Sequence, residues 1–357
     1  MKKTITNLQS EAIELLKQLI STQSFSREED KTAEILAKKL DEHGISFSRD
    51  KNNIWAVNQY FDEKKPTILL NSHHDTVKPS NAYTRDPFSP VIEEGKLFGL
   101  GSNDAGGCLV SLLVTFLHFY NEKNLSYNFC FLATAEEEIS GKNGASLAFP
   151  QLPGIDFAIV GEPTQMNAAI AEKGLMVIDG EAHGFSGHAA RGEGENSIYK
   201  AIKDISAIEI LKFEEESEWL GPVKVTVTQV EAGSQHNVVP NSCRFVIDCR
   251  TTDKMGNEEL FEHLKSICES ELTARSFRLR PSFIDENHPF VQIAKSQGKT
   301  CYGSPTTSDQ AVMNVPSLKL GPGDSARSHT ADEFIFISEI EAGISDYISM
   351  LWELVEL

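Results

Sequence analysis

The sequence predicts an α/β protein with a mostly parallel mixed sheet flanked by helices, plus a smaller inserted α+β domain. Three observations lead to this prediction. The 357 residues exceed the roughly 150 of a typical domain, which suggests two domains. Short apolar runs alternate with helical patterns along most of the chain, as expected for a sheet covered by helices. One central segment breaks that alternation and follows a different order.

The larger domain is predicted from its N-terminus onward. Apolar residues recur at helical spacing in 12–19 and in 33–40, where Gly44 marks a stop. We interpret the apolar runs as buried strands and the longer amphipathic or apolar patterns as helices. The expected strands are 54–57, 67–70, 129–133, 157–160 and 317–320, and the later helices are 106–120 and 337–354.

The central segment predicts a ferredoxin-like unit. Its expected elements, in order, are a strand (175–182), a helix (197–211), two strands (223–230 and 242–249), a helix (257–272) and a strand (277–281). This β-α-β-β-α-β order is the split βαβ arrangement. We therefore expect one domain formed by residues 1–172 and 284–357, interrupted by a domain formed by residues 173–283.

Composition excludes several classes of function. The 52 acidic and 33 basic residues give a net charge of −19, which disfavours binding to nucleic acid. No run approaches the roughly 18 apolar residues of a membrane span. The six cysteines contain no C-x-x-C pair, so we expect reduced thiols and a cytoplasmic location.

Polar side chains typical of metal sites follow four of the predicted strands. His73 and Asp75 follow the second strand, residues 136–138 follow the third, Glu162 the fourth, and His329 lies beyond the last. In open α/β sheets, ligands bind outside the carboxyl ends of the strands. The pattern therefore indicates one metal site at that edge, although each motif alone is compatible with a role that involves no metal.

His73 and Asp75 point the same way if the segment is extended. The carboxylate could then reach the second nitrogen of a metal-bound imidazole and fix its tautomer. The same sequence is also compatible with a surface turn that contains two histidines and binds no metal. His74 would face the opposite side of such a strand.

Asp104 precedes a predicted helix and could simply be its N-cap. The surrounding glycines also approach two nucleotide-binding motifs, but each lacks a required residue. Asp104 stands where the dinucleotide motif needs its third glycine, and Gly107 stands where a P-loop needs lysine.

The three glutamates 136–138 could form a solvated acidic loop. Cations would better explain why a buried strand runs directly into them, since like charges this close repel by about 1 kcal/mol in water and more when buried. Ser186 resembles the nucleophile of a serine hydrolase, but the motif needs glycine where His188 stands.

Taken together, these motifs resemble a superfamily of di-zinc amidohydrolases and peptidases. It includes acetylornithine deacetylase, succinyl-diaminopimelate desuccinylase, aminoacylase and carboxypeptidase G. The resemblance covers nearly the whole chain and is closest to the first two enzymes. It rests on SHHDTV (72–77), GLGSND (99–104), TAEEE (134–138), GEPT (161–164) and SHTADE (328–333). Glu136 replaces the usual Asp, outside the two functional positions.

The resemblance implies two Zn²⁺ ions per subunit, for which Co²⁺ can substitute. The implied ligands are His73 and Glu162 for one ion, Glu138 and His329 for the other, and Asp104 as a bridge. Glu137 would be the general base and then the general acid, while Asp75 would orient His73. Three ligand carboxylates and one hydroxide balance the charge of two Zn²⁺ ions, as burial requires.

The resemblance also implies a homodimer that forms through the inserted domain, which would act as a lid. His188 would stabilise the oxyanion from the partner subunit, and Arg250 and Asn237 would hold the substrate near its carboxylate. Each of these three residues could instead have a purely structural role, His188 as a surface loop histidine and the other two in a turn or at a strand end.

The expected reaction is hydrolysis of the amide bond of an N-acyl amino acid by a metal-bound hydroxide. N-acetylornithine, in arginine biosynthesis, is the first candidate substrate, and N-acetylcitrulline and N-succinyl compounds belong to the same class. A dipeptidase or aminopeptidase of the superfamily would use the same residues. A metal-free binding protein on this scaffold would lack a metal ligand or the general base, whereas this sequence has all five ligands and the base.

Overall fold

The computed structural model describes residues 4–356, which divide into two compact units. Unit 1 extends to Ile170 and resumes at Phe283–Tyr302 and at Ser308. Unit 2 comprises Ala171–Ser282 and Gly303–Thr307. The short segment Gly303–Thr307, which lies outside the expected insert, therefore also belongs to unit 2.

Unit 1 is built on a nine-stranded sheet, which confirms the predicted α/β class. Its spatial order is β1-β2-β6-β3-β7-β15-β8-β13, and β14 also pairs with β8. The strands are β1 Ser48–Asp50, β2 Asn53–Val57, β3 Thr67–His73, β6 Asn128–Thr134, β7 Phe157–Val160, β8 Ala168–Glu172, β13 Ser282–Phe283, β14 Cys301–Ser304 and β15 Ser317–Lys319. The four central strands β6, β3, β7 and β15 are parallel, so their carboxyl ends share one edge.

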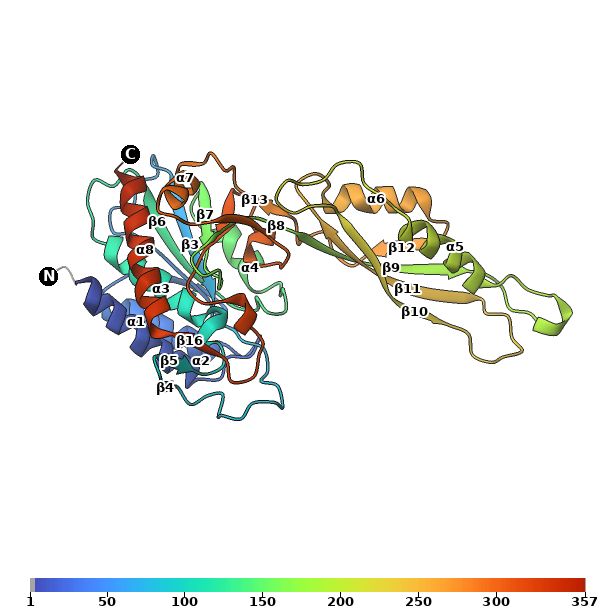
Figure 1. Ribbon diagram of the computed structural model, residues 1–357, viewed down its shortest axis with the longest axis horizontal. Helices are drawn as coiled ribbons and strands as arrows, with labels where there is room; N and C mark the ends of the chain where they lie inside the picture. The colour runs from blue at the N-terminus through green and yellow to red at the C-terminus, as the bar shows by residue number, and fades with distance from the viewer. Residues whose placement is uncertain (1–3, 357) are drawn as a thin grey trace. The chain divides into compact units, whose positions relative to one another are not determined.

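Helices cover both faces of this sheet (Figure 1). On one face lie α1 Ile5–Ile20, α3 Gly107–Phe119 and α8 Ile337–Val355, with α7 Pro289–Ser296 packed on α8. α3 is buried almost all round, because it is apolar on every side. On the other face, α4 Ala145–Ala148 packs Ala145 and Ala148 against the sheet residues Leu69 and Leu132. α2 Asp30–Glu42 contacts β2.

A small three-stranded sheet joins distant parts of unit 1. It consists of β4 Val91–Glu93, β5 Lys96–Phe98 and β16 Phe334–Phe336, in the order β16-β5-β4. β16 follows the SHTADE motif, so this pairing ties that motif to the segment before Asp104.

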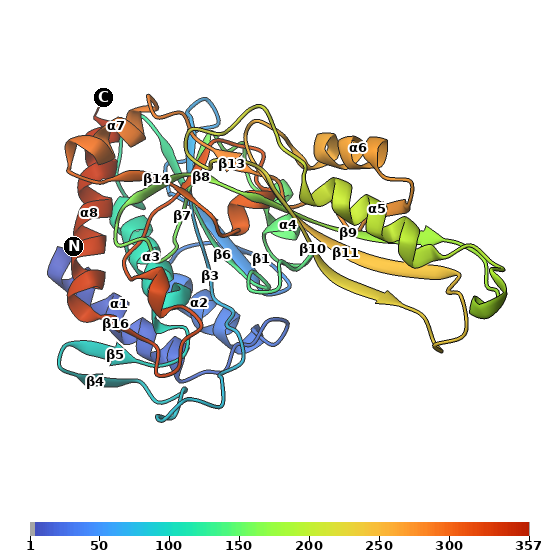
Figure 2. The same ribbon diagram turned by 45° about the vertical axis from the view of Figure 1, so that its right-hand side comes forward.

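Unit 2 has a four-stranded antiparallel sheet of order β10-β11-β9-β12. Its elements are β9 Gly174–His183, α5 Ser197–Glu209, β10 Lys224–Ala232, β11 Ser242–Thr251, α6 Asn257–Ile267 and β12 Glu271–Ala274. α5 and α6 lie on the same side of the sheet, as Figure 2 shows, and enclose a core around Phe245 and Leu260.

The last two elements predicted for this unit are wrong in position. α6 ends at Ile267, and the fourth strand is Glu271–Ala274 instead of 277–281. The helical pattern predicts Leu272 as the last apolar residue of the helix, whereas it is a buried strand residue. Short apolar runs do not distinguish a helix end from a strand by periodicity alone.

The six cysteines are free, and four of them are buried. Across residues 4–356, the structure contains no helix with the length and apolar character needed to cross a bilayer.

We predict a pH-dependent loss of stability from His74. Its Nε2 donates to the carbonyl oxygen of Asn52 (2.8 Å), and its Nδ1 lies 2.9 Å from the Thr32 hydroxyl. Burial lowers the pKa of His74 to about 4. Between pH 6.5 and 4 the unfolded chain therefore binds a proton that the folded chain does not. The free energy of unfolding should fall by about 3 kcal/mol as pH drops through this range.

Urea unfolding at pH 7 and pH 4, with EDTA present, measures this effect. His74→Gln should lose about 3 kcal/mol less than wild type over the same range. His183→Gln, at an exposed histidine of unit 2, serves as the matched control. Equal losses in wild type and His74→Gln would exclude the effect.

Candidate metal centre and active site

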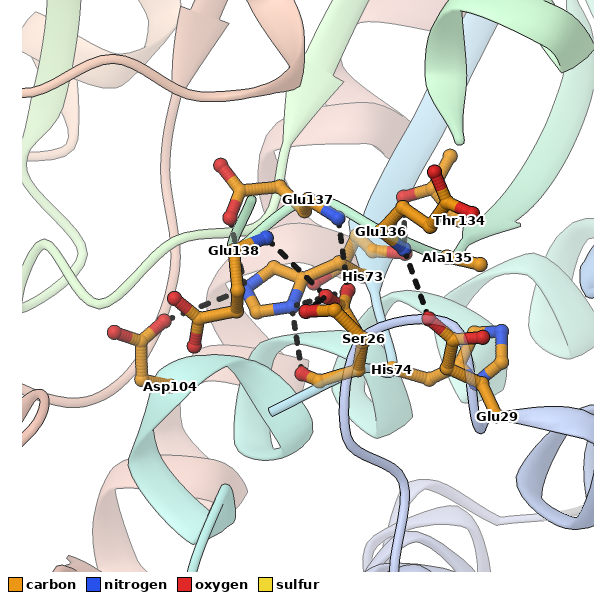
Figure 3. Close-up of polar contacts among 12 residues, drawn as sticks. Ser26, Glu29, His73, His74, Asp104, Thr134, Ala135, Glu136, Glu137 and Glu138 are labelled. Atoms are coloured by element: carbon orange, nitrogen blue, oxygen red, sulfur yellow. Dashed lines mark hydrogen bonds and ion pairs between the residues drawn. The ribbon is translucent and has the colours of Figure 1, made fainter. Parts of the chain in front are cut away.

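The carboxyl ends of β3, β6 and β7 bring acidic and imidazole side chains together. His73 is the last residue of β3, and the glutamates 136–138 follow β6 (Figure 3). Glu162 follows β7. Two overlapping groups have ligand atoms within 4.8 Å of one another, namely His73, Asp104, Glu138 and His73, Glu137, Glu162. We call all of these residues, together with His329, the acidic cluster.

His73 presents one ring nitrogen to this cluster. Its Nδ1 is 3.0 Å from the carbonyl oxygen of Asp75, and because a carbonyl only accepts, Nδ1 carries the proton. Its buried Nε2 has no hydrogen-bond partner, although Asp104 Oδ1 lies 3.4 Å away and Glu137 Oε2 4.0 Å away. A buried nitrogen lone pair facing carboxylates fits a bound cation, which would satisfy both.

Asp104 faces both histidines of the cluster. Its Oδ1 lies 3.4 Å from His73 Nε2, and its Oδ2 lies 3.6 Å from His329 Nε2. His329 Nε2 is also 2.9 Å from Glu138 Oε2. Asp104 thus directs one carboxylate oxygen toward each imidazole.

The turn that carries Asp104 is held by a residue that the sequence pattern does not single out. Glu333 accepts the backbone N–H groups of Gly101 (3.0 Å), Asn103 (2.8 Å) and Asp104 (2.9 Å). Asp104 is not the N-cap of α3, because that position is Gly106. Glu333 stands at the end of SHTADE, so its motif is visible in the sequence but its contact with residue 104 is not.

Electrostatics in the cluster also favour a cation. Burial and the neighbouring carboxylates raise the pKa of Glu137 well above its usual value. Burial lowers the pKa of His73, but the nearby carboxylates of Asp104, Asp75 and Glu137 outweigh it and raise the pKa well above the usual value. The hydrogen bond to Glu138 raises the pKa of His329 to about 9. The two histidine shifts reflect the surrounding carboxylates, and the Glu137 shift reflects burial first and the neighbouring carboxylates second.

The carboxylate of Asp75 is expected to hydrogen-bond the second nitrogen of His73, but the carbonyl oxygen of Asp75 does so instead. Its carboxylate is 3.4 Å from His73 Nδ1, whereas its carbonyl oxygen makes the hydrogen bond to that nitrogen. The carboxylate instead accepts the Ser26 hydroxyl (2.7 Å) and the backbone N–H groups of Glu137 (3.0 Å) and Glu138 (3.2 Å). Asp75 thus links the imidazole to the acidic turn.

The glutamates 136–138 do not form a solvated loop, because Glu136 is buried and the side chains of Glu137 and Glu138 are 13% and 7% exposed. His74 points away from the cluster, toward Thr32 and Asn52.

The remaining predicted residues belong to unit 2. His188 is exposed, and its Nδ1 accepts the backbone N–H of Ala190 (3.2 Å). The next residue, Ala189, donates its N–H to the carbonyl of Asn237 (3.1 Å), so His188 and Asn237 lie on adjacent loops. Arg250 engages both oxygens of Asp248, at 2.9 and 3.2 Å.

The fold and the acidic cluster define a metal-dependent hydrolase of the kind that cleaves amides. The model of peptidase family M20/M25/M40 matches residues 69–353. The chain therefore belongs to this family and is a metal-dependent amidohydrolase.

Curated relatives include succinyl-diaminopimelate desuccinylase of Buchnera aphidicola subsp. Acyrthosiphon pisum. It is 28% identical over 296 residues, which cover 78% of this chain and 77% of the relative. Similar solved structures include aminopeptidase PepT from Bacillus cereus, with TM-score 0.78 and 20% identity over 98% of this chain and 99% of that one.

The Bacillus subtilis YXEP protein is described as a dinuclear metal binding peptidase. It is similar with TM-score 0.74 and 17% identity over 98% of this chain and 99% of that one.

We predict that cation binding at the acidic cluster stabilises the protein. Dialysis against a chelator should lower the unfolding temperature, and zinc or cobalt should restore it. A ligand that binds only the folded state, at a free concentration 1,000 times its Kd, raises the free energy of unfolding by about 4 kcal/mol. Differential scanning calorimetry with metal analysis measures both effects.

Two neighbouring glutamates provide a matched pair for that experiment. Glu138→Gln should reduce the zinc-dependent shift, whereas Glu136→Gln should retain it, because the Glu136 carboxylate accepts from Asn143 outside the cluster. An unfolding temperature that does not respond to zinc in the wild type would contradict the metal site.

Proposed function

We propose that this protein is a zinc-dependent enzyme that hydrolyses the amide bond of an N-acyl amino acid. The observation that carries the proposal is the acidic cluster around the buried, unpartnered Nε2 of His73, at the carboxyl edge of the parallel strands. The relatedness to succinyl-diaminopimelate desuccinylase supports this substrate class.

Two metals would divide the cluster between them. His73 and Glu162 would hold one ion, and Glu138 and His329 would hold the other. Asp104 would bridge the two ions, and the fact that its two oxygens face the two histidines supports this role. The dinuclear site described for the YXEP protein supports the same number. When bound, the pair of divalent ions polarises an amide carbonyl and makes a water acidic near neutral pH.

Glu137 would move the proton. Its carboxylate lies 4.0 Å from His73 Nε2, and its backbone is anchored to Asp75 (3.0 Å). As general base its Oε2 would accept the proton of the attacking water, and as general acid it would deliver that proton to the leaving amine nitrogen. His188 would donate a hydrogen bond to the developing oxyanion.

The acyl group and the amino acid form the finer part of the proposal. N-acetylornithine would place the enzyme in arginine biosynthesis in the cytoplasm, and N-acetylcitrulline and N-succinyl compounds are the other members of the class. Arg250 and Asn237 would hold the substrate near its carboxylate, for which Arg250 would exchange its present partner Asp248.

A second candidate is a peptidase of the same family, which the fold similarity to PepT favours. The same cluster would cleave a peptide bond by the same proton transfers. In the first candidate the acyl side of the bond is an acetyl or succinyl group, whereas in the second it is an amino acid.

Unit 2 would form a homodimer that closes over the substrate. The outer edge of β10 carries no strand partner among the described residues. Exposed apolar side chains lie on β10 and on the helix packed against it, at Val230, Tyr199 and Ile202. A second copy of the chain would cover both.

A substrate panel tests the activity. The zinc-loaded enzyme should release amino acid from at least one of N-acetyl- and N-succinyl-ornithine, -citrulline and -lysine, with little turnover of dipeptides and tripeptides, as measured by amine release. Glu137→Gln should abolish turnover while retaining zinc, because the amide cannot accept the proton. Turnover confined to peptides would replace the proposal with the peptidase candidate.

Mixing subunits tests the role of His188. His188→Ala should lower kcat about 100-fold if the imidazole stabilises the oxyanion. If it acts across a dimer, mixing weakly active His188→Ala subunits with inactive Glu137→Gln subunits should raise the activity, because heterodimers contain one intact site. A mixture whose activity does not rise after verified exchange would place the action of His188 within one chain.

A further inference from the structure

The turn after β6 is held by side chains instead of by a neighbouring strand. Four consecutive backbone N–H groups point at side-chain oxygens from three other segments. The pairs are Ala135 with Asn53 Oδ1 (3.1 Å), Glu136 with Glu29 Oε1 (3.2 Å), Glu137 with Asp75 Oδ1 (3.0 Å) and Glu138 with Asp75 Oδ2 (3.2 Å).

Glu136 is the pivot of this turn. Its φ of 53° lies in the left-handed region, which costs a residue with a side chain roughly 1–2 kcal/mol. Its carboxylate accepts from the side chain of Asn143 (2.7 Å), and its N–H donates to Glu29. A change of backbone angle at Glu136 would displace Glu137 and Glu138 together, because they are the next two residues.

The side chain of Glu29 contacts the backbone of Glu136 and does not cap its own helix. It is the N-cap residue of α2, yet its side chain makes no capping hydrogen bond. The side chain is fully buried. It accepts the N–H of Arg27 (2.5 Å), the side-chain amide of Asn52 (2.9 Å) and the N–H of Glu136, which is 107 residues away in the sequence. Figure 3 shows Glu29 on the side of the turn opposite Asp104.

We propose that Glu29 is a positioning residue, which sets the backbone of the acidic turn so that Glu137 and Glu138 meet the substrate and the metal. This inference rests on the proposed roles of those two residues. Glu29 touches neither substrate nor metal and acts only through the N–H of Glu136. A carboxylate suits this task, because one oxygen accepts two N–H groups while the other accepts an amide.

Glu29→Ala tests the proposal. We expect kcat on the best substrate of the panel to fall about 10- to 100-fold with KM within about threefold, since partners behind a metal site typically change activity or metal affinity by that factor. The Kd for zinc at the weaker site, titrated with a chromophoric chelator, should rise about tenfold. The zinc titration needs no substrate, so it tests Glu29 even if no panel compound is hydrolysed.

The conservative variant separates positioning from charge. Glu29→Gln keeps a carbonyl oxygen for the two N–H groups, and its amide nitrogen can face Asn52 once that amide turns. It should retain kcat and the Kd for zinc within about threefold of wild type. Equal losses in Glu29→Gln and Glu29→Ala would overturn the proposal in favour of a charge effect.

Asp204→Ala is the matched control. Asp204 is a buried carboxylate of unit 2 that accepts the backbone N–H groups of Glu269 (3.0 Å) and Ser270 (2.8 Å). Its removal should lower the unfolding temperature without changing the Kd for zinc or kcat, which excludes a general effect of lost stability.

A folded, zinc-loaded Glu29→Ala enzyme with wild-type kcat and zinc affinity would overturn the proposal. If Glu29→Ala does not fold, Glu29→Asp replaces it, because this variant keeps the charge but withdraws the carboxylate by one methylene. Reduced kcat or zinc affinity in Glu29→Asp supports positioning, and wild-type values reject it. A wild-type enzyme inactive on every panel compound would instead reject the proposed function.

Discussion

The structure of the site depends on the need to satisfy backbone N–H groups where parallel strands end. After the end of β6 the chain forms a turn at the carboxyl edge of the sheet, where its backbone N–H groups no longer have a neighbouring strand to bond to. Carboxylates supply the missing acceptors, with Asp75 and Glu29 serving the acidic turn and Glu333 serving the turn at Asp104. Carboxyl groups therefore surround the cluster on its protein side as well as inside it.

The sequence predicts the parts of this arrangement that depend on local pattern. Buried parallel strands are encoded as short apolar runs, and the polar residues after them fall at one edge because the strands run the same way. This pattern alone places His73, Glu138 and Glu162 near one another, and in the structure His73 lies within a few ångströms of the ligand atoms of both glutamates. The family resemblance supplies the pairing of ligands, which local pattern cannot.

Long-range contacts are beyond the reach of local pattern. Glu29 has the position of a helix-start residue, and only the fold shows that its carboxylate turns away from α2 toward residue 136. Glu333 is part of a motif, but its three N–H partners lie more than 200 residues earlier. The prediction also extends a helix over the residues that form β12. This error has a simpler cause, since a short amphipathic run after a helix is compatible with a continued helix or with a strand.

The position of β15 has a consequence for synthesis of the protein. This strand pairs with β7 on one side and β8 on the other, although it is encoded about 150 residues after them. A nascent chain that has not yet emerged as far as residue 317 lacks the strand that belongs between β7 and β8. An unpaired strand edge is prone to association with other chains, so this ribosome-bound intermediate exposes β7 and β8 to such association until β15 has been made.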